Sequence, residues 1–439
     1  MKNESKKSVH VDLTRNPKQA DYFYTALGAA QNANSFKFLN YGGAVRGGKT
    51  FVTLAILIRL AEIFPGSRWH IIRKDMPSLE ATTIPSFEKI VAGSRKWTFY
   101  RNKSNYHARH KNGSKIFFKG ENIQQDPNLM KFLGVETNGF FLEQAEELSE
   151  KMWDKALERT GSWYIPKMPR GLIFMTFNPC QNWVKTKIYD PYCNDTLSEE
   201  FFYMSALPDD NPFVTQDQFH GWSMMAERYY KQFVKGDWTD FDGEDGRWAF
   251  SFKRKKHVGK TVWDPTQPTY LSFDFNRNPI VCSVWQHHDG LIRGIECIKI
   301  KDCTIHRLCD EIKERYPGGF FFVTGDASGD TLTTMSNISN FGVIKQSLDL
   351  AKTQMQYSAS NPRLKDSRML VNTILEKYPL IVDEEKCKPI IDDCERCKAN
   401  SDGTIIKNNR ADESQQADTL DTFRYYIHRY FRDHIRFFE

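Results

Sequence analysis

The sequence lacks a long apolar run, a disulfide framework and a secretion signal. No window approaches about 18 uncharged apolar residues, so we expect no membrane-spanning helix. The nine cysteines are scattered, which favours a reducing, cytosolic setting. One C-x-x-C pair, Cys394 and Cys397, has no second pair of the kind that structural zinc sites use. The first residues carry lysines with no apolar segment behind them, which argues against a signal peptide.

Strong charge imbalance is also absent. Lysine and arginine number 61 against 55 acidic residues, a net charge of +6, which is compatible with nucleic acid but does not establish it. Apolar residues make up 40% and aromatic residues 14%, enough for packed cores, so a disordered chain is excluded. The 439 residues suffice for two domains, and we detect no internal repeat. We therefore expect a soluble, intracellular protein of two domains.

A G-x-x-x-x-G-K-T motif at residues 43–50 is the most specific feature that the sequence does have. In such a P-loop the backbone N–H groups turn toward the phosphates of a nucleotide, here at Gly43, Gly47 and Gly48. Lys49 is expected to reach the β and γ oxygens, and the Thr50 hydroxyl to hold Mg²⁺. The motif predicts a nucleoside triphosphate site.

The surroundings of this loop fit the prediction. Residues 36–41 are predicted to form a strand, and residues 51–60 an apolar helix whose positive N-terminal dipole would face the phosphates. Arg46 lies inside the loop, either as an arginine finger from the same chain or as a salt-bridge partner. Gln19, on a short helix beginning near residue 16, is either an adenine reader or an exposed helical glutamine.

Apolar strands separated by helical stretches predict a parallel α/β sheet in a first domain. Ligands of such sheets bind at the carboxyl ends of the strands, where the polar residues lie. Thr176 and Asn178 at one such end are candidates to sense the γ-phosphate. We place this domain at residues 1–240, with residues 1–16 loosely ordered. Its further strands are expected at residues 68–74, 115–120, 139–147 and 171–179.

An acidic cluster follows the strand that starts at Gly139. Glu143 is the natural acid on the Mg²⁺ side. The next position usually holds a catalytic glutamate, but here it is Gln144, which can orient water without being a strong base. Glu146 or Glu147 would replace it if the backbone turns suitably; alternatively Glu143 is itself the catalytic acid.

The strand pattern restarts after an acidic stretch at 237–246 and a basic stretch at 251–257, which indicate a linker at 241–262 and a second domain at 263–439. Three segments of this domain supply carboxylates of the kind that a two-metal phosphodiester hydrolase needs: Asp274, Asp326 and either Asp418 or Asp421. An Asp inside a buried strand is costly without a partner such as a metal. Asp421 has Arg424 as an alternative partner, so we favour Asp418, and Glu296 is a possible fourth ligand. Strands are expected at residues 270–276, 279–286, 292–300 and 320–326, and a last helix at 417–427.

Together these motifs resemble the large terminase subunit of tailed bacteriophages. The resemblance rests on the arginine-containing P-loop, the acidic Glu-Gln-Ala-Glu-Glu-Leu segment, a Thr-Phe-Asn-Pro strand end and the later aspartates, all in the order of that family. It extends from about residue 17 over nearly the whole chain. Further matching segments are residues 112–120, 210–213, 229–238 and 421–425.

The resemblance implies an ASCE-type P-loop ATPase domain followed by an RNase H-like nuclease domain. It implies a motor that drives double-stranded DNA into a procapsid and cuts concatemeric DNA. Such a motor works as a ring, usually a pentamer, on the portal protein. The small terminase subunit recognises the DNA, in the cytoplasm of the infected bacterium. The ATPase would use ATP with Mg²⁺, and the nuclease two Mg²⁺ or Mn²⁺.

Carried over by position, Lys49, Thr50 and Arg46 would bind phosphates, and Glu143 would serve Mg²⁺. Thr176 and Asn178 would form the coupling motif, and the nuclease metals would be bound by Asp274, Asp326 and Asp418. The departure from the family is Gln144. Two other interpretations are a P-loop helicase or repair translocase with an accessory nuclease, and a DNA-binding subunit whose ATPase Gln144 has silenced. The single P-loop argues against a helicase, which normally carries two motor cores.

Overall fold

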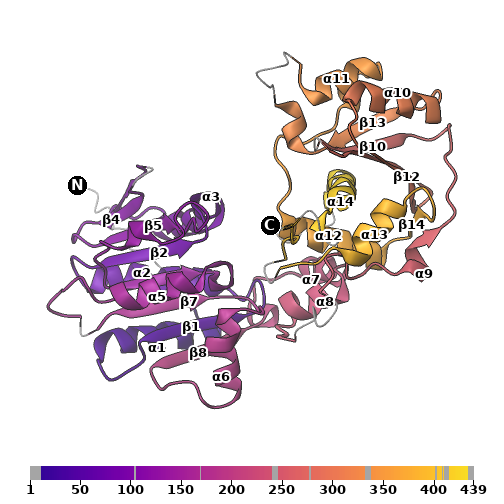
Figure 1. The fold of residues 1–439 in the computed structure, drawn as a ribbon. Coiled ribbons are helices and arrows are strands. Elements are labelled where there is room, and N and C mark those ends of the chain that lie inside the picture. The colour runs from indigo at the N-terminus through magenta and orange to yellow at the C-terminus, as the bar shows by residue number, and fades with distance from the viewer. Residues whose placement is uncertain are drawn as a thin grey trace, which may run out of the picture. The chain divides into compact units, whose positions relative to one another are not determined.

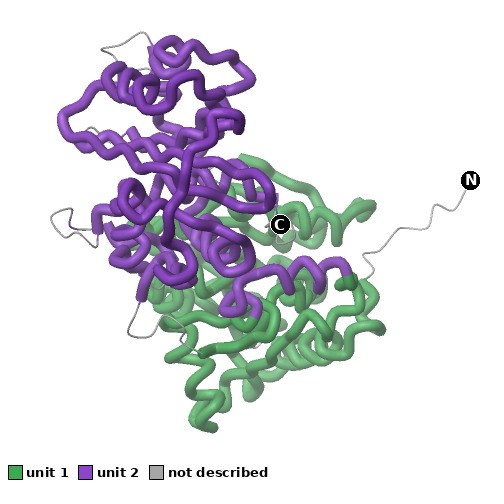
Figure 2. Tube along the Cα trace, turned by 90° about the vertical axis from the view of Figure 1, so that its right-hand side faces the viewer, with its two compact units in different colours: residues 1–216, 231–239 green, residues 217–230, 240–439 purple. Residues whose placement is uncertain are grey.

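The computed structural model of the chain (Figure 1) divides into two compact units. Figure 2 colours the first, residues 1–216 and 231–239, and the second, residues 217–230 and 240–439. The structure describes residues 11–102, 105–168, 170–239, 246–275, 278–331, 338–400, 403–407, 409 and 415–433.

The first unit is built on an eight-stranded sheet in the order β3-β4-β5-β2-β6-β7-β1-β8. From β5 to β8 all neighbouring strands are parallel, while β3 and β4 add an antiparallel edge. The strands are β1 (Phe38–Gly43), β2 (Arg68–Arg73), β3 (Trp97–Tyr100), β4 (His107–His110), β5 (Lys115–Gly120), β6 (Gly139–Glu143), β7 (Leu172–Thr176) and β8 (Phe201–Ala206).

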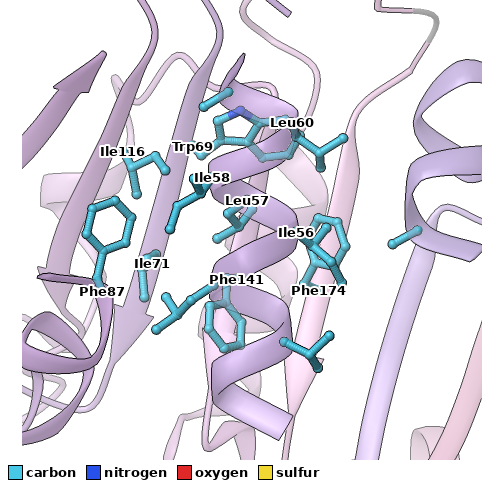
Figure 3. Close-up of a cluster of buried hydrophobic side chains, with 14 of the residues drawn as sticks. Ile56, Leu57, Ile58, Leu60, Trp69, Ile71, Phe87, Ile116, Phe141 and Phe174 are labelled. Carbon is cyan, nitrogen blue, oxygen red and sulfur yellow. The ribbon is translucent and has the colours of Figure 1, made fainter. Parts of the chain in front are cut away.

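The central strands β1, β6 and β7 are buried along their whole length, as expected for a parallel sheet covered on both faces. Their alternate residues enter two hydrophobic clusters, one with α1 (Pro17–Gln31) and α2 (Lys49–Ile63), the other with α5 (Glu150–Arg159). Helix α2 is apolar nearly all round and therefore buried. Figure 3 shows its side chains among those of the sheet, including Trp69, Phe141 and Phe174.

The strand order places β7 between the P-loop strand β1 and β6, which is the additional strand of ASCE-type ATPases. In the register, Thr176 is paired with both Tyr41 of β1 and Glu143 of β6. The carboxyl ends of these three parallel strands therefore meet at one edge of the sheet. The expected fold class of the first unit is confirmed.

The second unit contains a six-stranded sheet in the order β13-β10-β11-β12-β14-β9. Strands β10, β11 and β12 form an antiparallel meander, and β13 lies parallel beside β10, which is the expected RNase H-like arrangement. Hydrophobic clusters pack three helices on one side of the sheet: α12 (Leu364–Lys377), α13 (Lys388–Arg396) and α14 (Asp418–Phe431). Two helices pack on the other side: α10 (Ile305–Arg315) and α11 (Asn340–Ser347). The strands are β9 (Val258–Gly259), β10 (Thr269–Asp274), β11 (Ile280–His288), β12 (Leu291–Ile300), β13 (Phe321–Gly325) and β14 (Leu380–Asp383).

The remaining α-helices of both units are short. They are α3 (Met76–Ser78), α4 (Ile84–Val91), α6 (Asp190–Cys193), α7 (Gln216–Ser223), α8 (Glu227–Tyr229) and α9 (Arg254–His257).

The structure differs from the expected linker at 241–262. Trp248 and Phe252 are buried in the hydrophobic core of the second unit, and β9 joins its sheet. The division between the units falls after Thr239, and residues 217–230 belong to the second unit. The charged residues around the aromatic ones concealed this packing in the sequence. Residues 241–245 and Asn276 lie outside the described residues.

Candidate functional site

The P-loop connects β1 to α2 through a backbone that only glycine fits easily. Gly43 and Gly48 have φ values of 103° and 77°, in the left-handed region. A Cβ on Gly43 would lie 2.3 Å from the Ala206 carbonyl oxygen, and one on Gly48 would lie 2.0 Å from Gln19 Nε2. Because the loop is pressed against β8 and α1, its shape is fixed by packing as well as by sequence.

Lys49 begins α2 and is buried inside the loop. Its Nζ donates to the Gly43 carbonyl at 2.9 Å, to the Ala44 carbonyl and to Asn178 Oδ1 at 3.1 Å. Burial lowers the pKa of the ammonium, and nearby Glu146 opposes that effect. The amine is thus held by three oxygen acceptors at the place where phosphate oxygens are expected.

Two further residues at the loop, Gln19 and Arg46, differ in solvent exposure. Gln19 is 7% exposed and donates from Nε2 to the Gly48 carbonyl at 3.0 Å, so the alternative of an exposed helical glutamine is wrong. Arg46 is exposed, with φ of 60°, and its carbonyl accepts from Asn211 Nδ2 at 2.6 Å. Adenine contact by Gln19 and a finger role for Arg46 stay predictions.

Glu143 ends β6 and faces the start of α2. Its carboxylate is 4% exposed and hydrogen-bonds with the hydroxyls of Thr83 and Thr50. Burial raises the pKa of Glu143, and nearby Arg73 together with the two hydroxyls opposes that rise. An acid beside the P-loop threonine has the geometry needed on the metal side of a bound Mg-nucleotide.

The chain turns sharply after Glu143. Gln144 has φ of 50°, a left-handed conformation that is rare for a residue with a side chain, and its N–H donates to Thr176 Oγ1 at 3.4 Å. A short 3-10 turn over Ala145–Glu147 follows. Glu146 then accepts from Asn178 Nδ2 at 2.7 Å through Oε1. Lys49, Asn178 and Glu146 are therefore joined in one hydrogen-bonded row.

The second group of predicted residues gathers at the end of β10. Asp274 and Asp326 follow paired positions of the parallel strands β10 and β13, and Asp326 N–H donates to the Phe273 carbonyl at 2.9 Å. Helix α14 is tied to the same strand, because Ser272 Oγ donates to the Thr422 carbonyl at 2.7 Å. Asp418 and Asp421 occupy the first turn of that helix and are both buried.

These carboxylates interact strongly with one another. Burial raises the pKa of Asp274 to about 7, with repulsion from Asp421, Asp418 and Asp326 adding to it and Lys407 opposing it. Burial by itself would raise the pKa of Asp326 as well. Hydrogen bonds donated to its carboxylate, the first of them from the Ser328 N–H, outweigh burial and leave that pKa lowered.

Asp421 is held by two cations. Arg424 Nε donates to it at 2.6 Å and Lys407 Nζ also contacts it. The guanidinium continues to the Tyr425 hydroxyl at 3.0 Å, which donates to Asp326 Oδ2 at 3.1 Å. Of the two expectations for Asp421, pairing with Arg424 is the one that the structure contains.

Glu296 does not join this cluster. It accepts from Tyr316 Oη at 2.6 Å and pairs with Arg315, both at the end of α10. The α10 side of the sheet is opposite the α14 side, so the expectation of Glu296 as a fourth ligand is wrong. Alternation along β12 put its side chain on the other face.

The donor chemistry of the acidic cluster suits a divalent cation, because buried carboxylates that repel one another gain from a shared positive charge. Their present arrangement is looser than a finished site: within the described ranges, no three His, Cys, Asp or Glu side chains are gathered as ligands of one metal ion. Electrostatic repulsion acts over a longer distance than coordination, which reconciles the two observations. The described cysteines are all free thiols.

Comparison with known proteins agrees with this architecture. Residues 34–237 match the family model described as phage terminase large subunit. That stretch of the chain is thus similar to the large terminase subunits of phages. The resemblance expected from the sequence is thereby confirmed.

Solved terminase structures match over nearly the whole chain. The large terminase of a thermophilic bacteriophage in complex with ATP-gamma-S is 16% identical, with a TM-score of 0.67, over 94% of this chain and 99% of that one. The complex of the same terminase with ADP gives 16% identity and a TM-score of 0.65, over 94% and 98% of the two chains. At such low identity these matches establish a shared fold. No curated protein is significantly similar in sequence to this chain.

Several residues of the two sites escaped prediction in this terminase-like chain. Thr83 lies in no motif and reaches Glu143 only through the fold. Lys407 contacts Asp421 from a separate segment. Tyr425, in contrast, could have been found from the sequence. It lies four residues after Asp421 on α14, a spacing that puts both residues on one helix face. Helical spacing from the predicted acids would have found it. In the described part of the chain, no helix has the length and apolarity to cross a bilayer.

Proposed function

We propose that this chain is the ATP-driven motor of phage DNA packaging and also a metal-dependent endodeoxyribonuclease. The observation that carries the proposal is the meeting of Lys49, Thr50 and Glu143 at the ends of parallel strands in a terminase-family region. The related terminase of a thermophilic bacteriophage forms complexes with ATP-gamma-S and with ADP, which supports ATP as the substrate.

The first unit would be the motor and the second unit the nuclease. In the motor, Lys49 would hold the β and γ phosphate oxygens, Thr50 and Glu143 the Mg²⁺ side, and Thr176 and Asn178 would respond to the γ-phosphate. Arg46 would neutralise charge that develops during transfer. The N-terminus of α2 favours bound anions by its dipole.

In the second unit, Asp274, Asp326 and Asp418 would bind two Mg²⁺ or Mn²⁺ ions. Such ions, when bound, activate a water for attack on a phosphodiester and stabilise the leaving oxygen. Asp421 would stay with Arg424 and Lys407, and Tyr425 would orient Asp326. Expected partners are double-stranded DNA, the small terminase subunit and the portal protein, with a homo-oligomeric ring during packaging in the host cytoplasm.

Two variants of the full chain test the proposal. Lys49→Ala is expected to abolish ATP hydrolysis and to leave Mg²⁺- or Mn²⁺-dependent DNA cutting in place. Asp274→Ala is expected to abolish cutting and to leave DNA-stimulated hydrolysis. Lys37→Ala and Asp310→Ala, which lie outside both sites, serve as matched controls. Full hydrolysis by Lys49→Ala would refute the motor site, and loss of both activities in Asp274→Ala would refute separate sites.

A packaging assay with purified procapsids then separates a packaging motor from a helicase or repair translocase. Wild-type protein should render DNA resistant to added nuclease only when procapsids and ATP are both present. Hydrolysis without such protection would favour the helicase interpretation. A wild-type chain that binds but never hydrolyses ATP would favour the silenced subunit.

A further inference from the structure

The sequence does not identify the general base of ATP hydrolysis, the residue that takes the proton from the attacking water, because Gln144 follows Glu143. An amide is not basic near neutral pH, so Gln144 can orient a water but cannot accept its proton. Its Oε1 is buried and has no hydrogen-bond partner among the described residues. The base therefore has to come from one of the three nearby glutamates.

Glu143 and Glu147 are both committed elsewhere. Glu143 is buried between the hydroxyls of Thr50 and Thr83, beside the first residues of α2, where the metal-side acid belongs. Glu147 pairs with Lys74 Nζ at 3.3 Å and with Arg73 Nη2 at 3.7 Å, at the end of β2. Glu147 is therefore paired with the cations at this strand end.

Glu146 is directed to the nucleotide side by the left-handed turn at Gln144. A residue in that conformation costs about 1 kcal/mol or more, and such outliers concentrate at functional sites. The turn is fixed by two further contacts: Asn182 Nδ2 donates to the Glu146 carbonyl at 2.9 Å, and Gln144 N–H donates to Thr176 Oγ1. The Glu146 backbone is therefore held rigidly relative to β7.

The Glu146 carboxylate is one side chain away from the P-loop amine. Asn178 Nδ2 donates to Glu146 Oε1 at 2.7 Å, while Asn178 Oδ1 accepts from Lys49 Nζ at 3.1 Å. An amide that binds both groups at once sets their separation and orientation. A γ-phosphate held by Lys49 would compete with Asn178 for the amine, so the amide links phosphate binding to the carboxylate.

We propose that Glu146 is the hydrolytic base of the motor and that Asn178 is its positioning residue; this inference rests on the proposed ATPase function. The water oxygen forms a bond to the γ-phosphorus while the bond from that phosphorus to the β,γ-bridging oxygen breaks, which releases ADP. The water proton passes to the Glu146 carboxylate and then to solvent. The usual position of the base, directly after Glu143, is left to a residue that orients the water.

Glu146→Gln in the full-length protein is the decisive variant, with Glu147→Gln as its matched control. Removal of a general base is expected to lower kcat of DNA-stimulated ATP hydrolysis at least ~100-fold. Binding of N-methylanthraniloyl-ATP should stay within about three-fold of wild type, because an isosteric amide retains the shape of the site. Glu147→Gln should keep kcat within about ten-fold. The residual rate of Glu146→Gln should also lose the decline at low pH that protonation of a base produces in wild type.

Glu146→Asp and Asn178→Ala separate chemistry from folding. Glu146→Asp keeps a carboxylate and should recover part of kcat, whereas a purely structural role would not distinguish Asp from Gln. Asn178→Ala should lower kcat with KM nearly unchanged. Retention of more than a tenth of kcat by Glu146→Gln, or loss of analogue binding in that variant, would overturn the assignment. If Lys49→Ala also keeps hydrolysing ATP, the motor site itself fails instead.

Discussion

The two acidic sites of this protein balance their charges in opposite ways. In the first unit each carboxylate near the P-loop has a donor from the chain: hydroxyls for Glu143, an amide for Glu146 and a lysine for Glu147. In the second unit Asp274 is surrounded by further carboxylates that add to the effect of burial and raise its pKa to about 7.

The difference reflects what each site is proposed to receive. A nucleotide brings its own negative charge, so the motor site presents Lys49 and places a hydrogen-bond or ion-pair donor beside each of its acids. A divalent cation brings positive charge, so the nuclease site stores carboxylates at a cost, because buried like charges disfavour ionisation. Within the same site Asp421 pairs with Arg424 and Lys407, and hydrogen bonds lower the pKa of Asp326.

Removal of Asp421 gives the largest expected loss of stability. Asp421→Ala leaves Arg424 buried without its carboxylate, and breaking a buried ion pair costs on the order of 3 kcal/mol. Urea unfolding of the full chain measures the loss. The exposed pair of Asp310 with Lys313 is the control, and Asp310→Ala should cost less than about 0.5 kcal/mol. Equal losses in the two variants would contradict the contrast between balanced and stored charge.

Asp274→Asn should raise the free energy of unfolding, and only above acidic pH. The folded-state pKa is about 7, whereas an unfolded Asp titrates near 4. Between these values the folded protein binds more protons than the unfolded chain, so the free energy of unfolding falls as pH rises. The variant, which cannot ionise, should therefore match wild type near pH 4 and exceed it at pH 8 by up to a few kcal/mol. Urea unfolding of both proteins in metal-free buffer at the two pH values measures the difference in stability. An equal difference at both pH values would refute repulsion among the buried carboxylates as its cause.

Gly48→Ala probes the rigid loop of the first site. Its Cβ would displace Gln19, and φ of 77° costs about 1–2 kcal/mol for alanine. We expect that loss in thermal or urea unfolding, together with loss of nucleotide binding. Gly28→Ala is the matched control, because nothing lies within 4 Å of the added Cβ and alanine favours helix α1 by about 0.5–1 kcal/mol. A neutral Gly48→Ala would show that the loop is not fixed by this packing.

Gln144→Glu has the smallest expected effect. If Glu146 is the base, a further carboxylate at 144 should change kcat of ATP hydrolysis by less than about three-fold. Gln144→Ala is a useful companion, since loss of water orientation should lower kcat where the added acid does not. A large gain of kcat in Gln144→Glu would place the base at position 144 and would overturn the assignment to Glu146.

Local sequence patterns by themselves determined several elements of the fold and the positions of two site acids. The Gly-rich motif with its flanking apolar segments predicted β1, the P-loop and α2, because a fixed spacing of glycines and a buried helix leave few alternatives. Alternation and strand-terminal acids placed Asp274 and Asp326 correctly at neighbouring strand ends. The linker expected at 241–262 was not predictable in this way, because Trp248 and Phe252 are buried only by packing within the folded second unit.

Tertiary structure alone decided which distant segments supply partners to the charged groups. Thr83 meets Glu143 and Lys407 meets Asp421 across distant parts of the chain, and no local spacing encodes such contacts. Alternation along β12 set the face on which Glu296 lies, but tertiary packing decided that α10 and not α14 covers that face. Gln144 shows most clearly what the sequence could not predict. The sequence shows that a glutamine follows Glu143, but only the structure shows that its left-handed conformation directs Glu146 to Asn178. Residue types set what chemistry is available, and the fold sets which charges are close enough to use it.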